Sequence, residues 1–255
     1  MSRIWVIATN TFREAVRDRI LNSILFFAVL MLGLSLALRE LSIGDSDKVV
    51  RGVALGGVSL LAAIVALFLG VSLVYKEIER RTIYTLAAKP IARWQLLLGK
   101  YLGIWLTLLA EVGLLFLFYV LIVSPQQGLP GAPVFVAMFM LIIELSLLSA
   151  WAMLFSTFAA PVTATAYSLC IYVIGHFADD LRLFGERAEP GAFKTTVLAL
   201  YRVLPNLESF NLRTEAVHGV SVPLAELVWT TAYGVGYTAA VLAVAMLIFT
   251  KRDFK

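Results

Sequence analysis

The stretch VFVAMFMLIIELSLLSAWAMLF, residues 134–155, decides the fold class. Its one charged side chain is Glu144, and a run of about 20 apolar residues is what an α-helix needs to cross a hydrocarbon core of about 30 Å. Five further apolar runs flank it, at 21–38, 53–75, 101–123, 162–177 and 224–249. Pro161 suits the first turn of the shortest, 162–177. We therefore predict an all-α membrane protein with six spans.

The composition of the 255-residue chain agrees with this prediction. Hydrophobic residues make up 60% and charged residues 15%, against roughly 45–50% and 25% in an average soluble domain. The net charge of +4 comes from basic residues beside the apolar runs, which indicates a membrane rather than nucleic acid as the partner. The one cysteine, Cys170, excludes a disulfide within the chain.

The N-terminal segment, residues 1–20, forms a unit of its own ahead of the transmembrane domain, 21–255. Apolar residues recur at helical spacing, at Ile4, Ala8, Phe12 and Ala15. The arginines Arg3, Arg13 and Arg17 lie largely outside this apolar stripe. Such a helix is typical of the membrane interface. A plain solvated helix that leads into the first span is the alternative.

Basic residues set the orientation. They precede the first span, fill the connection between spans two and three, and follow the last span, where they include Lys251, Arg252 and Lys255. The positive-inside rule therefore predicts that both termini are cytoplasmic. The loop 178–223 then lies outside with balanced charges, and its stretch 193–204, ended by Pro205, predicts a short helix on the outer membrane surface.

The connection between spans two and three, 76–100, carries the most informative pattern. Residues 75–103 read YKEIERRTIYTLAAKPIARWQLLLGKYLG. We predict that Thr82 caps a short helix through Ala88, that Lys89-Pro90 ends this helix, and that a second helix starts near Ala92. A short charged helix between two membrane helices is a docking element for a soluble partner. An ordinary charged loop that fixes topology is the alternative.

This segment resembles the signature of type-2 ABC permeases, which have the type V exporter fold. The matching positions are Glu77, Glu79, Thr82, Leu86, Lys89, Pro90, Arg93, Leu97, Leu98, Gly99 and Lys100. Many members have glycine where this chain has Arg81, and in this respect the chain is similar to the permease of the nitrous-oxide-reductase maturation transporter. The resemblance extends to TFREAVRDRIL at 11–21, LPNLESFNL at 204–212 and KRDF at 251–254.

The resemblance implies a six-helix half-transporter in the bacterial inner membrane. A second permease chain, identical or related, completes the membrane part, and two copies of a cytoplasmic ATPase bind ATP and magnesium. The loop between helices two and three is then the coupling helix. Its expected ATPase contacts are Glu77, Glu79, Arg80, Arg81, Thr82, Tyr84, Leu86, Lys89, Pro90 and Arg93.

The chain carries no catalytic motif of its own. It lacks G-x-x-x-x-G-K-[ST], H-E-x-x-H and G-x-S-x-G. His176 and His218 have no partner at metal-ligand spacing, so we interpret them as isolated surface or interface histidines. We expect no metal, no cofactor, no nucleic acid and no enzymatic activity.

Two carboxylates, Glu111 and Glu144, fall near the midplane of spans three and four. A charge there costs at least ~2.5 kcal/mol, so each is a functional candidate. The alternative, which we favour, is that each is protonated or hydrogen-bonded to a neighbouring helix. Further candidates for a transport path or for helix packing are small or polar residues on single helix faces, Gly56, Ser59, Ala63, Thr165, Ser168 and Tyr172.

The predicted function is the permease subunit of an ATP-driven exporter that works by alternating access. A membrane anchor for a maturation complex is one rival. An intramembrane enzyme using Glu111 and Glu144 is another. Loop 178–223 is a candidate contact for an outer or periplasmic partner.

Overall fold

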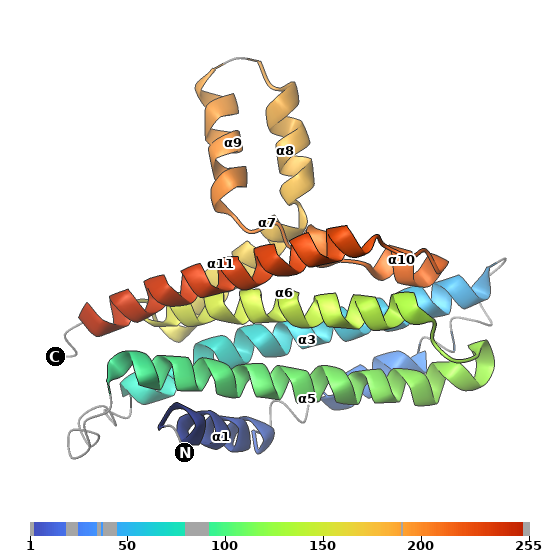
Figure 1. The fold of residues 1–255 in the computed structure, drawn as a ribbon, viewed down its shortest axis with the longest axis horizontal. Coiled ribbons are helices and arrows are strands. Elements are labelled where there is room, and N and C mark those ends of the chain that lie inside the picture. The colour runs from blue at the N-terminus through green and yellow to red at the C-terminus, as the bar shows by residue number, and fades with distance from the viewer. Residues whose placement is uncertain are drawn as a thin grey trace.

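The computed structural model describes residues 3–18, 25–34, 37, 45–79, 92–189 and 191–251, and every regular element within these ranges is a helix. Figure 1 shows a bundle of long helices from which a hairpin of two shorter helices projects. The chain order is α1 Arg3–Val16, α3 Ser46–Glu79, α5 Arg93–Gln127, α6 Ala132–Ser156, α7 Pro161–His176, α8 Ala178–Arg187, α9 Ala192–Val203, the short 3-10 helix η2 Glu208–Phe210, α10 Arg213–His218 and α11 Leu224–Lys251.

Four of the described helices, α3, α5, α6 and α11, are long and apolar enough to cross a membrane. A fifth crossing arises if α7 and α8, which meet at a bend of 63°, count as one broken span. Pro161 occupies the first turn of α7, as predicted. The predicted first span, 21–38, lies partly outside the described residues, which contain the apolar helix Leu25–Leu34. The count of six therefore stays a prediction.

The long helices continue beyond the apolar runs that predicted them. Helix α3 runs on to Glu79 and α5 begins at Arg93, so the connection is shorter than the predicted loop 76–100. Charged side chains end an apolar run without ending the backbone hydrogen bonds of a helix, which explains the difference. At 35 residues, α5 is about 52 Å long at 1.5 Å per residue.

Helix α6 forms the centre of the bundle and packs against α3, α5, α7 and α11. Small residues let the backbones approach, since a Cβ added to Gly70 of α3 would lie 2.5 Å from the Cβ of Ala152 of α6. Close packing of this kind is how membrane helices associate without a hydrophobic driving force. Gly70 therefore allows α3 to pack closely against α6.

Helix α1 packs on the first turns of α5. Two glycines of α5 form its seat: an added Cβ on Gly99 would meet Ile7 at 2.7 Å, and one on Gly103 would meet Thr11 at 2.5 Å. Contacts move four residues along both helices together, so α1 and α5 run in the same direction. The helix ends at Val16 rather than near residue 20, and its buried side is Ala8, Thr11 and Ala15, with Ile4 and Phe12 only half-buried.

The loop 178–223 contains more structure than the one helix predicted. The predicted helix is present as α9, and it pairs with α8 across Gly185, which lies against Val197 and Leu198. Helix α8 was not predicted, because its frequent charges hide the apolar spacing of Ala178, Leu181 and Gly185. Figure 1 shows the α8–α9 hairpin projecting from one side of the bundle.

After the hairpin, residues 204–212 return into the bundle. Leu207 and Phe210 are fully buried. The backbone N–H of Leu207 donates to the oxygen of Gly175 at 2.9 Å. A Cβ on Gly234 of α11 would lie 2.8 Å from the Phe210 ring. The motif LPNLESFNL is therefore part of the core.

Candidate functional site

The end of α3 and the start of α5 lie at one end of the bundle, together with the start of α1 and the end of α11 (Figure 1). Lys100 of α5 is buried there, and its Nζ donates a hydrogen bond of 2.7 Å to the backbone oxygen of Leu73 of α3. Nearby, Arg93 Nη1 donates to the oxygen of Thr250 of α11 at 3.2 Å. Two cationic side chains thus tie three helices together beside the connection.

Most of the predicted coupling residues lie in this connection. Arg80, Arg81, Thr82, Tyr84, Leu86, Lys89 and Pro90 fall at positions 80–91, outside the described residues. Glu77 and Glu79 belong to the last turn of α3, and Arg93 is the first residue of α5. The predicted second helix near Ala92 is confirmed, with Ala92 as its N-cap.

The face formed by α3 and α7 carries exposed apolar side chains and a pocket. A pocket of about 500 Å³ lies between these helices, and its lining is apolar apart from two hydroxyl groups: Ile64, Leu67, Phe68, Val71, Ser72, Pro161, Thr165 and Leu169. Apolar side chains beside it are exposed, including Val162 at 83%. The Ser72 hydroxyl is buried and has no hydrogen-bond partner. Exposed apolar surface of this extent marks contact with lipid or with another protein.

The six residues predicted to line a path or to pack helices separate into three groups. Thr165 is exposed and lines the α3–α7 pocket. Ser59, Ala63 and Ser168 are buried within the chain, and Ser168 donates to the oxygen of Ala164 at 2.7 Å. The other two members of the set lie beside polar partners: Gly56 next to the Arg213 guanidinium and Tyr172 against the His176 ring.

Glu144 of α6 faces His176, the last residue of α7. The Glu144 Oε1 and His176 Nε2 atoms are 3.4 Å apart, and Glu144 is 2% exposed. His176 is therefore not isolated, contrary to the sequence interpretation. The two residues are far apart in sequence and on different predicted spans, so spacing gave no sign of the contact.

The geometry around Glu144 and His176 indicates which of their atoms carry a hydrogen. His176 Nδ1 lies 3.0 Å from the backbone oxygen of Tyr172. That oxygen accepts, so Nδ1 carries a hydrogen and Nε2 of the neutral ring offers a lone pair. An ionised Glu144 would also offer lone pairs, so the contact is favourable when the two residues hold one proton between them.

Charged residues of the returning segment lie close to this pair. Glu208 and Arg213 both interact electrostatically with Glu144 and with His176. Asn211 links them, since its Nδ2 donates to Glu208 Oε1 at 3.0 Å and its Oδ1 accepts from Arg213 Nε at 2.6 Å. The result is a polar cluster of six residues inside the bundle, Glu144, Tyr172, His176, Glu208, Asn211 and Arg213.

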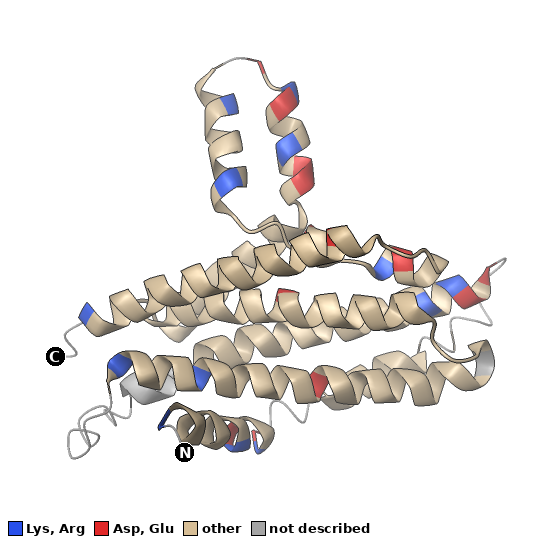
Figure 2. Ribbon diagram, viewed as in Figure 1, with Lys and Arg blue, Asp and Glu red and all other residues tan. Residues whose placement is uncertain are grey.

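Glu111 lies on a different helix, α5, and is 6% exposed. Its Oε2 atom is buried without a hydrogen-bond partner. Figure 2 shows the acidic residue of α5 and that of α6 as isolated red bands in otherwise uncharged stretches. Each carboxylate thus sits in its own environment rather than in a shared acid–base pair.

The opposite end of the bundle carries a polar cavity of about 420 Å³ beside the start of α3. Arg51 ties α3 to the end of α5, because its Nε donates to Gln127 Oε1 at 2.8 Å. The Lys48 ammonium is 2.6 Å from Asp45 Oδ2, and its hydrogen bond lowers the pKa of that carboxyl.

In the described ranges, no group of three or more His, Cys, Asp or Glu is arranged to hold a metal ion.

Several apolar helices of spanning length define a multi-pass membrane protein. A family model described as ABC-2 family transporter protein matches residues 5–254, nearly the whole chain. The chain therefore belongs to the ABC-2 transporter family, whose members are the membrane permease subunits of ABC transporters. A comparison with curated proteins finds no significant match.

Proposed function

We propose that this permease is the membrane half of an ATP-driven exporter that works by alternating access. Two such chains, identical or closely related, pair in the bacterial inner membrane with both termini cytoplasmic. Each binds one soluble ATPase, which holds ATP and magnesium. The observation that carries the proposal is the exposed apolar α3–α7 face, which a second permease chain would cover.

The apolar lining of the α3–α7 pocket supports a paired arrangement. Exposed residues on α7 alternate with residues buried against the bundle, Ala164, Ser168, Ile171 and Gly175. A second chain on the exposed side would enclose the 500 Å³ pocket, with Thr165 among its lining residues. The enclosed space between the two chains is the proposed route for substrate.

The ties at the cytoplasmic end support a coupling role for residues 77–93. Lys100 fixes the end of α3 to α5, and Arg93 fixes the start of α5 to α11. A push by the ATPase on the connection would therefore reach three membrane helices together. The bundle would rock as a body, as alternating access requires.

A narrower proposal concerns the biological setting. The resemblance to permeases that mature nitrous oxide reductase, together with the projecting α8–α9 hairpin, favours an outer partner protein at loop 178–223. Exposed apolar residues on the hairpin, Leu183, Phe184, Phe193 and Leu200, support such a contact. On this view the chain also anchors a maturation complex, and transport and anchoring are compatible roles.

The test is purification of the native complex, followed by native mass spectrometry. We expect two permease chains with two ATPase chains, and bound small molecules that name the substrate. A stable, active complex with a single permease chain would contradict the paired arrangement. Absence of any ATPase from an otherwise intact complex would favour the anchor role alone.

A further inference from the structure

Helices α6 and α11 enclose a sideways-facing groove that the proposed transport function does not use. Its volume is about 690 Å³, and it lies toward the end of the bundle where α6 and α11 begin. Its ten lining residues include no charged side chain, and Thr231 supplies a lone hydroxyl group: Phe135, Val136, Phe139, Met140, Leu224, Leu227, Val228, Thr231, Ala232 and Val235.

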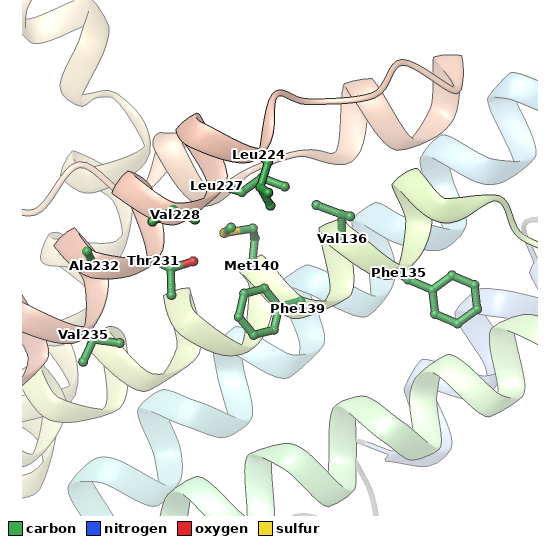
Figure 3. Close-up of a pocket in the computed structure, with 10 residues that line it drawn as sticks. All are labelled: Phe135, Val136, Phe139, Met140, Leu224, Leu227, Val228, Thr231, Ala232 and Val235. Atoms are coloured by element: carbon green, nitrogen blue, oxygen red, sulfur yellow. The ribbon is translucent and has the colours of Figure 1, made fainter.

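Figure 3 shows these side chains on the two helices that border the gap, with Met140 and Phe139 facing the α11 side. Several are strongly exposed, such as Leu224 at 76% and Val228 at 58%. Since both helices are of spanning length and composition, this groove opens to the hydrocarbon region. An acyl chain fits such a lining, because the hydrocarbon region offers no water to solvate a polar occupant.

A small cleft adjoins the groove at Val136, which lines both, and its lining is apolar apart from Glu215 and Ser221. The cleft has a volume of about 70 Å³ and is bordered by Pro133, Glu215 and Ser221, among others. This is more than the roughly 30 Å³ that a water molecule occupies in the liquid. A compact ionic group can therefore enter.

Glu215 is the one charged residue in the lining of the cleft. Its Oε2 atom is buried and has no hydrogen-bond partner. The residues that line the cleft include no lysine or arginine to balance it. Arg213, two positions earlier, points to α3 instead, where its Nη1 would meet a Cβ on Gly56. A buried carboxylate oxygen in this setting calls for a cationic hydrogen-bond donor.

We propose that the groove and cleft together form a binding site for an aminophospholipid, with an acyl chain along α6 and α11 and the primary ammonium group on Glu215. A primary ammonium offers three N–H donors, whereas a choline group carries the charge without a donor and a glycerol headgroup leaves the phosphate charge unbalanced. We therefore expect the cleft to bind the ethanolamine headgroup more tightly than the choline or the glycerol headgroup. Lipid binding at this site requires neither transport nor the ATPase.

The test is native mass spectrometry of the full-length protein after delipidation and addition of one lipid at a time. The lipids are phosphatidylethanolamine, phosphatidylcholine and phosphatidylglycerol with identical acyl chains. We expect phosphatidylethanolamine to be retained most, by about tenfold over phosphatidylglycerol, which corresponds to one charge-assisted hydrogen bond. Equal retention of all three would overturn the headgroup assignment.

Two pairs of variants locate the site. Glu215→Gln should abolish the preference for phosphatidylethanolamine, whereas Glu226→Gln, an exposed carboxylate at the same end of α11, should keep it. Val228→Trp should fill the groove and lower retention of every lipid, whereas Leu247→Trp, equally exposed on α11 but outside the groove, should not. A Val228→Trp variant that keeps full retention would refute the site. So would a cross-link between two copies at Val228, since a second chain would then occupy the groove.

Discussion

Lys100 donates a hydrogen bond to the backbone oxygen of Leu73, and this contact joins α3 and α5 about two helical turns from the residues where α3 ends and α5 begins. The cation is 4% exposed, so it is desolvated and its position is well defined. Under the proposed coupling role, this link would carry motion of the connection into both α3 and α5. Lys100 also belongs to the signature string, where sequence alone assigned it no partner.

We expect Lys100→Met to loosen the end of α3. Loss of a hydrogen bond to a charged group is worth about 1.5 kcal/mol, or roughly tenfold in an opening equilibrium. Hydrogen exchange at backbone amides 70–79 should accelerate by that factor, while Lys251→Met, on an exposed lysine at the same end, should leave it unchanged. Unaltered exchange in Lys100→Met would mean that the contact does not hold α3.

The coupling segment should bind the ATPase through its apolar side chains. We expect the double change Tyr84→Ala with Leu86→Ala to weaken ATPase binding or to separate hydrolysis from transport, since buried aromatic contacts are worth ~2 kcal/mol or more in interfaces. Glu77→Ala should do less, and its effect should shrink at high salt. Subunit stoichiometry and ATP hydrolysis in nanodiscs provide the measurement, and unchanged values with unchanged transport would show that residues 77–93 only connect two spans.

The seat of α1 should fail when a side chain fills it. Gly103→Leu should push α1 from α5, because an added Cβ would already lie 2.5 Å from Thr11. Overpacking of this kind costs about 1–3 kcal/mol. Gly113→Leu on the same helix is the matched control, since nothing lies within 4 Å of its added Cβ. Thermal unfolding together with exchange of amides 4–16 measures the effect, and equal behaviour of the two variants would place α1 elsewhere.

The Glu144–His176 pair should tolerate an amide but not a hydrocarbon. Glu144→Gln keeps a donor for the lone pair of His176 Nε2, so transport-linked ATPase activity should stay within tenfold of the unmutated complex. Glu144→Leu should destabilise the protein by about 1–3 kcal/mol, because it removes the carboxyl group that lies 3.4 Å from the half-buried His176 ring.

The double variant Glu144→Leu with His176→Leu should recover part of that loss, and the coupling energy from the mutant cycle should reach 0.5–3 kcal/mol. Additive single effects would show that the pair is not energetically linked.

Glu111→Gln should also preserve activity, and a tenfold loss in a normally assembled Glu111→Gln complex would assign that carboxylate a role in transport.

The proposed pairing over α3 and α7 should show in cross-linking. Cys170 is the one cysteine of the chain and lies exposed on α7. In a Cys170→Ser background, Val162→Cys on α7 should give a dimer with a flexible bismaleimide in membranes. Trp229→Cys, at a comparably exposed site on α11, should not. Dimers from Trp229→Cys alone would move the interface to the opposite face.

The sequence predicted the parts of the fold that depend on apolar runs. Helices α3, α5, α6, α7 and α11 were all expected, because a membrane helix must be apolar over most of its length. Helix ends were less well predicted, because the backbone of α3 continues through charged residues that hydropathy excludes. Helix α8 was missed for a related reason, since its charges obscure its spacing.

Contacts between distant residues lay beyond sequence reasoning. His176 has no metal-ligand partner nearby in the chain, and its actual partner, Glu144, lies on another helix. The burial of Leu207 and Phe210 was likewise invisible, because a short stretch with Pro, Asn and Ser has the composition of a surface loop. In both cases the returning segment 204–212 creates the environment.

The start of α8 and the segment that follows α9 are hydrogen-bonded to each other and to α11. Asn206 Nδ2 donates to Asp179 Oδ1 at 2.9 Å, and the backbone N–H of Asn206 donates to the Tyr233 hydroxyl at 3.0 Å. The chain therefore leaves and re-enters the bundle at nearly one point. A change in the length of the segment between Asp179 and Asn206 would therefore leave the two anchoring contacts, and the packing of the bundle that they border, in place.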